Sequence, residues 1–289
     1  MDCFYVSCER LRDPDLIDQP VVVGMSYTPG ESRGAVATAS YEARELGIES
    51  AMNISKALSI LPDAELNPPF EPSCYYRPVD KNFYREISQS VRNILEDFSD
   101  VTRHVSIDEA YLDVTSKTTW NSSAKFSQTL KDEIEAVIGV PSSIGIASSM
   151  SVAKMASAIE KPRGLVVVKP EQTQNFLFPL PIENLPGIGP VTAKSLHADG
   201  IHLIGELAKI PIGNLKDKYG NKGISFSTLS RGEDSKKVLP MGPKKSISRE
   251  SSFKQITINF NEKKALIEQL SQDVGSIASS NNAFFRTVG

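Results

Sequence analysis

Two adjacent carboxylates, Asp108 and Glu109, are the residues of this 289-residue chain whose types and spacing first suggest chemistry. Neighbouring side chains in a regular strand point to opposite faces, so both acids can face one site only where the chain turns. We therefore predict a strand at 105–107, the two acids at a hairpin tip, and a return strand at 110–114. Such a pair suits a hard cation such as Mg²⁺. The simpler interpretation is a solvated hairpin tip, which is what most adjacent Asp-Glu pairs are.

A second group of polar side chains follows a stretch of small residues that includes Ala37. Thr38, Tyr41 and Arg44 are spaced by three residues, and on a helix they would share one face. Hydroxyl and guanidinium groups donate readily to phosphate oxygens, so this trio suits an anionic ligand. The small residues would let a ligand approach the backbone closely, but tight helix packing explains them equally well.

Two further segments suggest contact with phosphates. Gly187 and Gly189 lie in a Gly-rich turn before a predicted helix, where free backbone N–H groups can bind an anion. The spacing to Lys194 does not match a P-loop. The 236–254 segment has six basic residues against one acid, which suits nucleic acid, although a solvated tether is the simpler interpretation.

Composition limits the class of protein. The net charge of −3 gives no global basic field, and apolar and charged fractions of 40% and 23% are ordinary for a soluble protein. Three scattered histidines predict no zinc site, and three cysteines without a CxxC pair indicate a reducing compartment. No signal peptide or run of roughly 20 apolar residues is present, so we expect a cytoplasmic protein, nucleoid-associated in a prokaryote, with no membrane contact.

The predicted elements describe an α+β chain. Residues 1–6 read as the end of a strand and 19–24 as a second strand. A ferredoxin-like sheet layered on helices is expected from four strands (105–107, 110–114, 143–147, 165–168) and the helices between them. A small helical unit follows the Gly-rich turn. A strand at 245–253, a helix at 261–279 and a strand at 283–288 then begin another α/β module.

In this order, the segments resemble Y-family translesion DNA polymerases of the DNA polymerase IV type. The resemblance covers essentially the whole chain and rests on its motifs: Asp2-Cys3-Phe4-Tyr5, Gly34-Ala35-Val36-Ala37-Thr38 with Tyr41-Glu42-Ala43-Arg44, Ser106-Ile107-Asp108-Glu109-Ala110-Tyr111-Leu112-Asp113, Lys161-Pro162 with Gly164, and Leu185-Pro186-Gly187-Ile188-Gly189. It implies a palm, small fingers, a helix–hairpin–helix thumb and an incomplete little finger (1–5 with 79–169, 6–78, 170–235 and 246–289), with a basic linker at 236–245.

The resemblance implies low-fidelity, template-directed nucleotidyl transfer with two Mg²⁺ ions. Asp108 and Glu109 match catalytic metal-binding carboxylates, and the backbone carbonyl of Met1 matches a further metal contact. Tyr5 matches the steric gate that excludes a 2′-hydroxyl, although without the motif a core aromatic is the simpler interpretation. Ala35 matches, like Ala37, a small residue over the nascent base pair. The remaining nucleotide-binding positions are Phe4, Ala37, Thr38, Tyr41, Arg44 and Lys161.

Primer–template DNA and deoxynucleoside triphosphates are the implied partners of an expected monomer, with DNA contacts at Gly187, Gly189, Lys244, Lys245 and Arg249. A sliding clamp is a further implied partner, through a C-terminal tail outside this chain. Two other hypotheses stay open: a non-catalytic DNA-binding module and a different palm enzyme such as a nucleotide cyclase. The helix–hairpin–helix turn argues against a cyclase, which has no use for a duplex grip.

One departure from the family pattern concerns the first motif. The family motif is Asp-x-Asp before the aromatic pair, and Asp2 matches its second Asp, which is not the catalytic one. The first Asp and its strand would lie upstream of residue 1. We therefore expect the 289-residue chain to be a fragment with little or no activity, because one of three metal-binding side chains is lacking.

Overall fold

The structure is a computed structural model that describes residues 1–66, 73–242, 245–251, 253, 258–284 and 286–287. The chain divides into two compact units, Met1–Pro240 and Met241–Gly289. Within the described ranges, every helix is too short or too polar to span a lipid bilayer.

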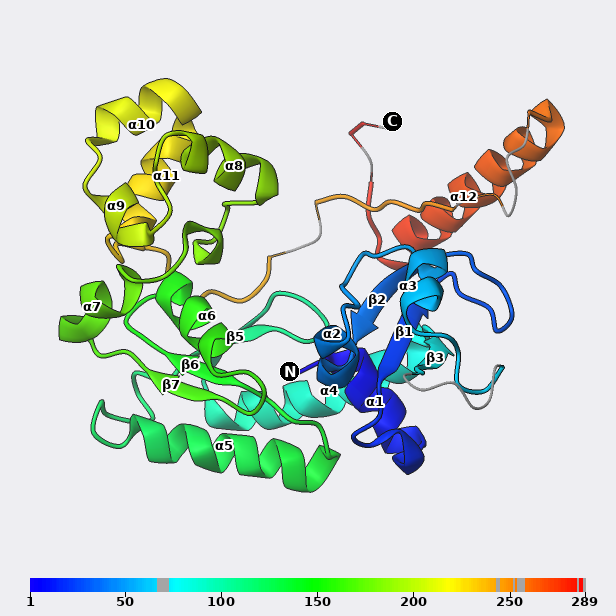
Figure 1. Ribbon diagram of the computed structural model, residues 1–289, viewed down its shortest axis with the longest axis horizontal. Coiled ribbons are helices and arrows are strands. Elements are labelled where there is room, and N and C mark those ends of the chain that lie inside the picture. Colours follow the sequence, from blue (N-terminus) through cyan, green and yellow to red (C-terminus); the bar gives the residue numbers. More distant parts are fainter. Residues whose placement is uncertain (67–72, 243–244, 252, 254–257, 285, 288–289) are drawn as a thin grey trace. The chain divides into compact units, whose positions relative to one another are not determined.

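The first part of unit 1 is a three-stranded sheet with short helices (Figure 1). Strand β1 (Val21–Met25) lies between β2 (Ala35–Ala39), which is antiparallel to it, and β3 (Tyr75–Pro78), which is parallel. The three valines of β1 are fully buried: Val22 packs with Tyr76 on one face of the sheet, while Val21 and Val23 pack into the cluster that contains Phe4 and Tyr84. The helical segments of this part are α1 (Phe4–Arg12), the 3₁₀ turn η1 (Pro14–Leu16), α2 (Tyr41–Glu45) and α3 (Ile54–Ile60).

The middle of unit 1 consists of two strand pairs and three helices. Strands β4 (Val101–His104) and β5 (Ala110–Asp113) form an antiparallel hairpin. The parallel strands β6 (Ile144–Ile146) and β7 (Leu165–Val167) lie between two helices, with α5 on one face and α6 on the other (Figure 1). The helices are α4 (Lys81–Phe98), α5 (Ser123–Ile138) and α6 (Met150–Ile159).

The last part of unit 1 is helical and packs around a continuous apolar core. Its segments are the 3₁₀ turns η2 (Pro170–Gln172) and η3 (Ile182–Asn184) and the helices α7 (Thr173–Leu177), α8 (Pro190–Ala198), α9 (Ile204–Ala208), α10 (Ile212–Tyr219) and α11 (Asn221–Ser230). Gly223 is required here, because a Cβ at this position would lie 1.9 Å from the Leu215 carbonyl oxygen. Helices α10 and α11 can therefore cross at close range.

The first predicted strand, at residues 1–6, is wrong. Helix α1 begins at Phe4, and the residue before it, Cys3, has a positive φ of 41°. Phe4 and Cys8, four residues apart, are both buried, so the apolar pattern follows the helical period rather than the alternation of a strand.

The predicted hairpin is confirmed with its first strand displaced. The paired residues end at His104, opposite Ala110, and residues 105–109 form the connecting loop. Ile107 is fixed in this loop by two contacts: its carbonyl oxygen accepts from the Ser88 hydroxyl of α4 at 2.5 Å, and its side chain packs against the apolar cluster that contains Phe4 and Tyr84. The two acids therefore lie at the hairpin tip, as predicted.

The single predicted sheet is divided in the structure. Among the described residues, β5 pairs with β4 and β6 pairs with β7, and the two pairs are not joined by a ladder. Side chains join them instead, since Met1, Leu112 of β5 and Ile144 of β6 pack against one apolar cluster of α4 and α5. The α+β class is confirmed, with smaller sheets than expected.

Unit 2 contains helix α12 (Phe260–Ser280), which matches the helix predicted at 261–279. The described residues of the predicted strands at 245–253 and 283–288 are not in strands, and the described part of unit 2 contains no strand with which they could form a ladder. Lys244 lies outside the described residues.

Candidate active site

The hairpin loop holds its acidic tip through hydrogen bonds within the loop and to α4. The backbone N–H groups of Val105 and Ser106 both donate to the Glu109 carbonyl oxygen, at 2.9 and 3.2 Å. The Ser106 hydroxyl donates to Oδ1 of Asp108 at 2.5 Å, and the Arg92 guanidinium donates to the Ser106 carbonyl oxygen at 3.2 Å. The Asp108 carboxylate therefore has a defined position before any ligand binds.

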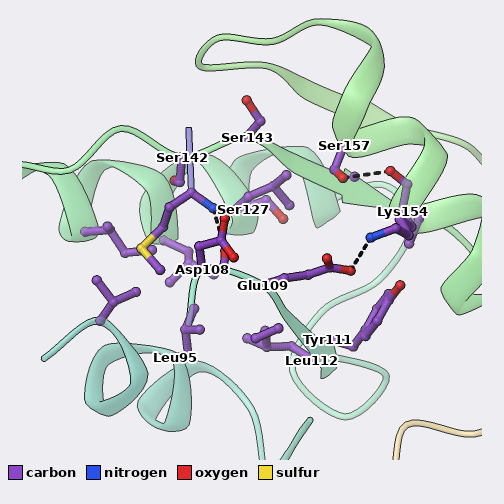
Figure 2. Close-up of a pocket in the computed structure, with 18 of the residues that line it drawn as sticks. Leu95, Asp108, Glu109, Tyr111, Leu112, Ser127, Ser142, Ser143, Lys154 and Ser157 are labelled. Carbon is purple, nitrogen blue, oxygen red and sulfur yellow. Dashed lines mark hydrogen bonds and ion pairs between the residues drawn. The ribbon is translucent and has the colours of Figure 1, made fainter. Parts of the chain in front are cut away.

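Glu109 reaches toward a different element of the fold. Nζ of Lys154, on α6, donates to Oε1 of Glu109 at 2.5 Å (Figure 2). Burial, followed by the charge and hydrogen bond of Glu109, raises the pKa of Tyr111 to about 12. The Tyr111 hydroxyl therefore stays protonated at neutral pH beside the carboxylate.

The two carboxylates line a cavity of ≈ 330 Å³ together with Lys161 and Met1. The Met1 ammonium donates to the Asp108 carbonyl oxygen at 2.7 Å. Its burial lowers the pKa of this ammonium, although the nearby charge of Asp108 opposes the shift. Met1, predicted to offer a backbone carbonyl, thus lies next to the hairpin tip.

Tyr5 lies on α1 near the acidic tip. Its ring stacks on Tyr84 with centroids 4.5 Å apart and an angle of 25°. Burial raises the pKa of Tyr5, and the next largest cause is the negative charge of Asp108. The phenol of Tyr84 donates to Oε1 of Glu9 at 2.6 Å, which fixes the ring on which Tyr5 rests.

The predicted phosphate-binding trio is not on one helix. Thr38 lies on β2, opposite Val23, and α2 begins only at Tyr41, capped by the Ser40 hydroxyl that accepts from the Ala43 N–H. The run of small residues therefore lies in strand β2 rather than in a helix. Helix α2 starts only after it, because the Ser40 side chain caps the first turn.

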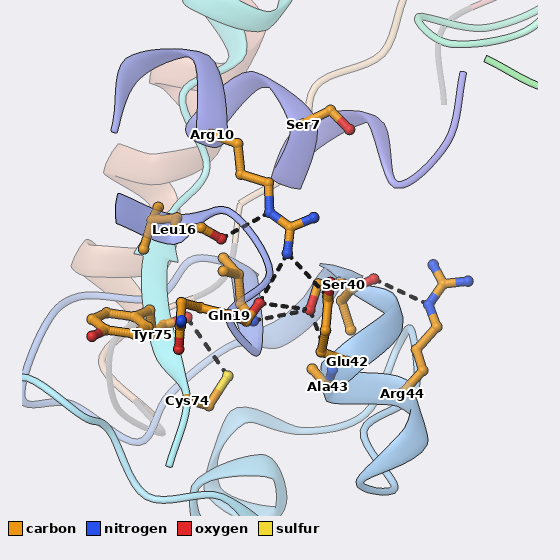
Figure 3. A network of polar contacts seen from close by, with 12 residues as sticks. Ser7, Arg10, Leu16, Gln19, Ser40, Glu42, Ala43, Arg44, Cys74 and Tyr75 are labelled. Carbon is orange, nitrogen blue, oxygen red and sulfur yellow. Dashed lines mark hydrogen bonds and ion pairs between the residues drawn. The ribbon is translucent and has the colours of Figure 1, made fainter. Parts of the chain in front are cut away.

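Tyr41 and Arg44 nevertheless lie close together on α2. The Arg44 guanidinium carbon lies 5.3 Å from the centre of the Tyr41 ring, and Nε donates to the Ala39 carbonyl oxygen at 3.1 Å. Figure 3 shows that Glu42 pairs with Arg10, at 3.0 Å, on a different side of α2 from Arg44. Glu42 therefore does not neutralise Arg44.

The Cys3 thiol lies near both α2, with Tyr41 and Arg44, and Lys161. Burial raises the pKa of the Cys3 thiol, while Arg44, Tyr41 and Lys161 act in the opposite direction. Burial and the proximity of Cys3 raise the pKa of Tyr41. Three predicted nucleotide-binding side chains, those of Tyr41, Arg44 and Lys161, therefore lie close enough to the Cys3 thiol to lower its pKa.

Asp2 is buried, with 1% of its surface exposed, and does not line the cavity. Its Oδ2 accepts from the Ser143 hydroxyl at 2.7 Å and from the Arg163 N–H at 2.9 Å, and its Oδ1 lies 3.6 Å from Nζ of Lys161. Its oxygens bind residues that precede β6 and β7, which fits a structural role.

The donor set of the hairpin fits a hard cation in part. Two carboxylates at one edge of a cavity are suitable oxygen ligands, and phosphate oxygens and water can complete an octahedron. Among the described residues, however, no group of three or more His, Cys, Asp or Glu side chains could hold a metal ion. The cysteines Cys3, Cys8 and Cys74 are free thiols.

The Gly-rich turn lies between η3 and α8. Gly187 has a φ of 97°, which favours glycine, and Gly189 is the N-cap of α8 with open space where a Cβ would be. Val191, in the first turn of the helix, is 87% exposed. The predicted DNA contacts Lys245 and Arg249 belong to unit 2, where both are exposed.

Sequence reasoning missed Lys154 and the partners of Asp2. The period of α6 could have indicated Lys154, because this residue interrupts an otherwise small and apolar helix. The contacts of Asp2 span 141 and 161 residues of sequence, so no local pattern could have indicated them.

Known proteins of one family are similar to this chain over its whole length. Residues 1–158 match the impB/mucB/samB family, and residues 170–201 match the helix–hairpin–helix motif of the same family. DNA polymerase IV of Halobacterium salinarum is 50% identical over 289 residues, which is 100% of this chain and 70% of that protein. DNA polymerase IV of Methanoculleus marisnigri is 35% identical over 288 residues, with 100% of this chain and 77% of that protein covered.

Solved structures lead to the same family. DinB from Sulfolobus solfataricus is 33% identical, with a TM-score of 0.73 over 82% of this chain and 67% of that chain. An insertion ternary complex of Dbh DNA polymerase has the same TM-score, identity and coverage. The chain therefore belongs to the Y-family of DNA polymerases, which are metal-dependent, DNA-directed nucleotidyltransferases. Within that family it is of the DNA polymerase IV type, which performs translesion synthesis. The hypothesis of a non-catalytic module is not favoured, and membership of this polymerase family argues against a cyclase.

Proposed function

We propose that the hairpin tip and the neighbouring helices form one site for a deoxynucleoside triphosphate and the primer 3′ end. The observation that supports this most directly is the shared cavity. Asp108, Glu109 and Lys161 line it, and the charge of Asp108 reaches Tyr5.

In this proposal Asp108 and Glu109 hold two Mg²⁺ ions, with the backbone carbonyl of Met1 as a further oxygen ligand. When bound, the ions would lower the pKa of the primer hydroxyl and neutralise charge on the transferring phosphoryl group. The protein's own task is to fix both carboxylates beforehand. Asp108 is fixed by Ser106, within the hairpin loop itself, so it needs little reorganisation.

The triphosphate binds to donors from three elements: Thr38 on β2, Tyr41 and Arg44 on α2, and Lys161 in the turn before β7. Three to four negative charges need several donors, and the planar guanidinium offers two parallel N–H groups. Phe4 and Ala37 contact the nucleotide as well. Ala37 and its small neighbour Ala35 leave the base pair loosely enclosed, which tolerates damaged templates at the expense of fidelity.

Tyr5 acts as the sugar gate in this arrangement. Its ring is held against Tyr84, whose own hydroxyl is bonded to the buried Glu9. A ring supported in this way cannot easily move aside for a 2′-hydroxyl. Selection for deoxyribose would follow from this rigidity.

Primer–template DNA would contact the backbone N–H groups at Gly187 and Gly189 and the basic residues Lys244, Lys245 and Arg249. In family terms, residues 1–5 and 79–169 would be the palm, 6–78 the fingers, 170–235 the thumb and 246–289 the little finger. The exposed first turn of α8 supports the contact at the glycines.

Nucleotide binding tests the proposal without requiring turnover. The protein is mixed with Mg²⁺ and a primer–template whose primer ends in a dideoxynucleotide, and the affinity for the complementary deoxynucleotide is measured. Arg44→Ala should weaken this affinity about 10- to 100-fold, because a charge-assisted hydrogen bond contributes about 1.5–3 kcal/mol. Lys117→Ala is the control, since Lys117 pairs with Asp100 at the far end of the hairpin. Equal affinities for wild type and Arg44→Ala would contradict the proposal.

A further inference from the structure

The ion pair between Lys154 and Glu109 joins two elements that are 45 residues apart in sequence. The nitrogen and oxygen atoms are 2.5 Å apart, and the side chains are 46% and 35% exposed. Figure 2 shows Lys154 projecting from α6 toward the Glu109 carboxylate at the cavity. Lys154 itself lines that cavity.

The platform under Lys154 is closely packed. A Cβ on Gly145 of β6 would lie 2.1 Å from the Ala153 carbonyl oxygen and 2.4 Å from the Ser157 backbone nitrogen. Helix α6 therefore rests directly on the strand at the turn that bears Lys154. The Ser157 hydroxyl also donates to the Lys154 carbonyl oxygen at 2.8 Å. The Lys154 ammonium group can therefore change its position only by rotation about the bonds of its own side chain.

The two adjacent carboxylates have different partners. Asp108 accepts from the Ser106 hydroxyl, within the hairpin loop. Glu109 accepts from a cation on another element, Lys154. Two neighbouring negative charges repel each other, and a lysine on one of them relieves the repulsion when no metal ion is bound.

We infer that Lys154 is a positioning residue that holds Glu109 in the ion-free site and competes with the divalent cation for it. This inference rests on the proposed function of Glu109 as a metal ligand. A cation of charge +2 that binds Glu109 repels the ammonium group beside it. Because the pair is half exposed, its separation costs about 1 kcal/mol or less. The released ammonium group is then free to contact phosphate oxygens of the nucleotide in the same cavity.

Manganese binding to the whole chain tests this inference without DNA or nucleotide. Free Mn²⁺ is measured by electron paramagnetic resonance during a titration of wild type, Lys154→Met and Lys154→Arg. Methionine keeps the length and helix propensity of lysine while removing its charge. We expect Lys154→Met to bind Mn²⁺ up to about fivefold more tightly, the factor that corresponds to about 1 kcal/mol. Lys154→Arg, which can re-form the pair, should resemble wild type.

A matched control lysine lies on α10. Lys218 pairs with Asp199, and their side chains are 47% and 35% exposed, almost the values of Lys154 and Glu109. Lys218→Met should leave Mn²⁺ affinity unchanged. In a Glu109→Gln background, Lys154→Met should lose its effect, because the side chain for which the two cations compete is then uncharged.

An equal or weaker Mn²⁺ affinity in Lys154→Met would overturn the inference. An effect that persists in the Glu109→Gln background would overturn it as well, since the lysine would then act without Glu109. These outcomes leave the proposed function intact if Arg44→Ala still weakens nucleotide binding. Absence of any Mn²⁺ binding by wild type would contradict both the inference and the metal site.

Discussion

Replacing Asp2 separates a structural acid from a metal ligand. Alanine at this position removes the acceptor of the Ser143 hydroxyl and of the Arg163 N–H. Each hydrogen bond to a charged group contributes about 1.5–3 kcal/mol, and the pair with the partly exposed Lys161 adds little. We therefore expect Asp2→Ala to lower the free energy of unfolding by roughly 3–6 kcal/mol.

Thermal unfolding followed by circular dichroism measures this loss. For a unit of this size, the expected decrease in melting temperature is about 10 °C. Asp2→Asn keeps the size and one acceptor oxygen, so its decrease should be smaller, and it tests the reasoning if Asp2→Ala does not fold. The control is Asp217→Ala on an exposed face of α10, which should stay within about 2 °C of wild type.

Manganese affinity, measured below the melting temperature of each variant, gives the second readout. A structural Asp2 predicts unchanged affinity in Asp2→Asn despite its lower stability. The reasoning is refuted if Asp2→Ala melts within 2 °C of wild type. It is also refuted if Asp2→Asn loses Mn²⁺ binding without losing stability, because Asp2 would then be a metal ligand.

Three other changes have definite expected outcomes. Tyr5→Ala should reduce the ratio of deoxy- to ribonucleotide affinity by about 100-fold, and Tyr5→Phe should preserve it, since a ring rather than a hydroxyl excludes the 2′ position; an unchanged ratio in Tyr5→Ala would contradict the gate. Gly145→Ala should lower stability by about 1–3 kcal/mol in urea unfolding, because α6 must move away from β6; wild-type stability would contradict the close packing. The Thr115 hydroxyl and N–H lower the pKa of Asp113, so this carboxylate stabilises the fold above its ordinary pKa of about 4 and the contribution is lost as the pH falls. Asp113→Asn should therefore weaken the acid dependence of the melting temperature, and an unaltered dependence would contradict the assignment.

The local sequence pattern was sufficient to predict the acidic hairpin tip and the helix at 261–279. Asp108 and Glu109 lie between two segments that pair. Leu130 and Ile134 of α5, four residues apart, are both buried, as the helical period requires. In the last turn of α5, however, Val137 is 64% exposed and Ile138 packs inward. The last turn of a helix is where small changes in direction move a residue from one face to the other.

Contacts between distant segments account for what the sequence did not predict. Residues 105–107, with Val105 and Ile107 alternating around Ser106, look like a strand, yet the Ser88 hydroxyl of α4 fixes the Ile107 carbonyl in the loop. Thr38 looks helical beside its small neighbours, yet it pairs with Val23 across β1 and β2. Both outcomes depend on partners at least 15 residues away, which propensity and periodicity do not include.

The most direct test of the central claim is template-directed nucleotide binding at the acidic hairpin. With Mg²⁺ and a primer ended by a dideoxynucleotide, wild type should bind the complementary deoxynucleotide more tightly than a mismatched one. The Asp108→Asn, Glu109→Gln double variant should bind both weakly and melt at a temperature close to that of wild type. Full, template-dependent affinity in that double variant would contradict the assignment of the hairpin carboxylates to the nucleotide and metal site.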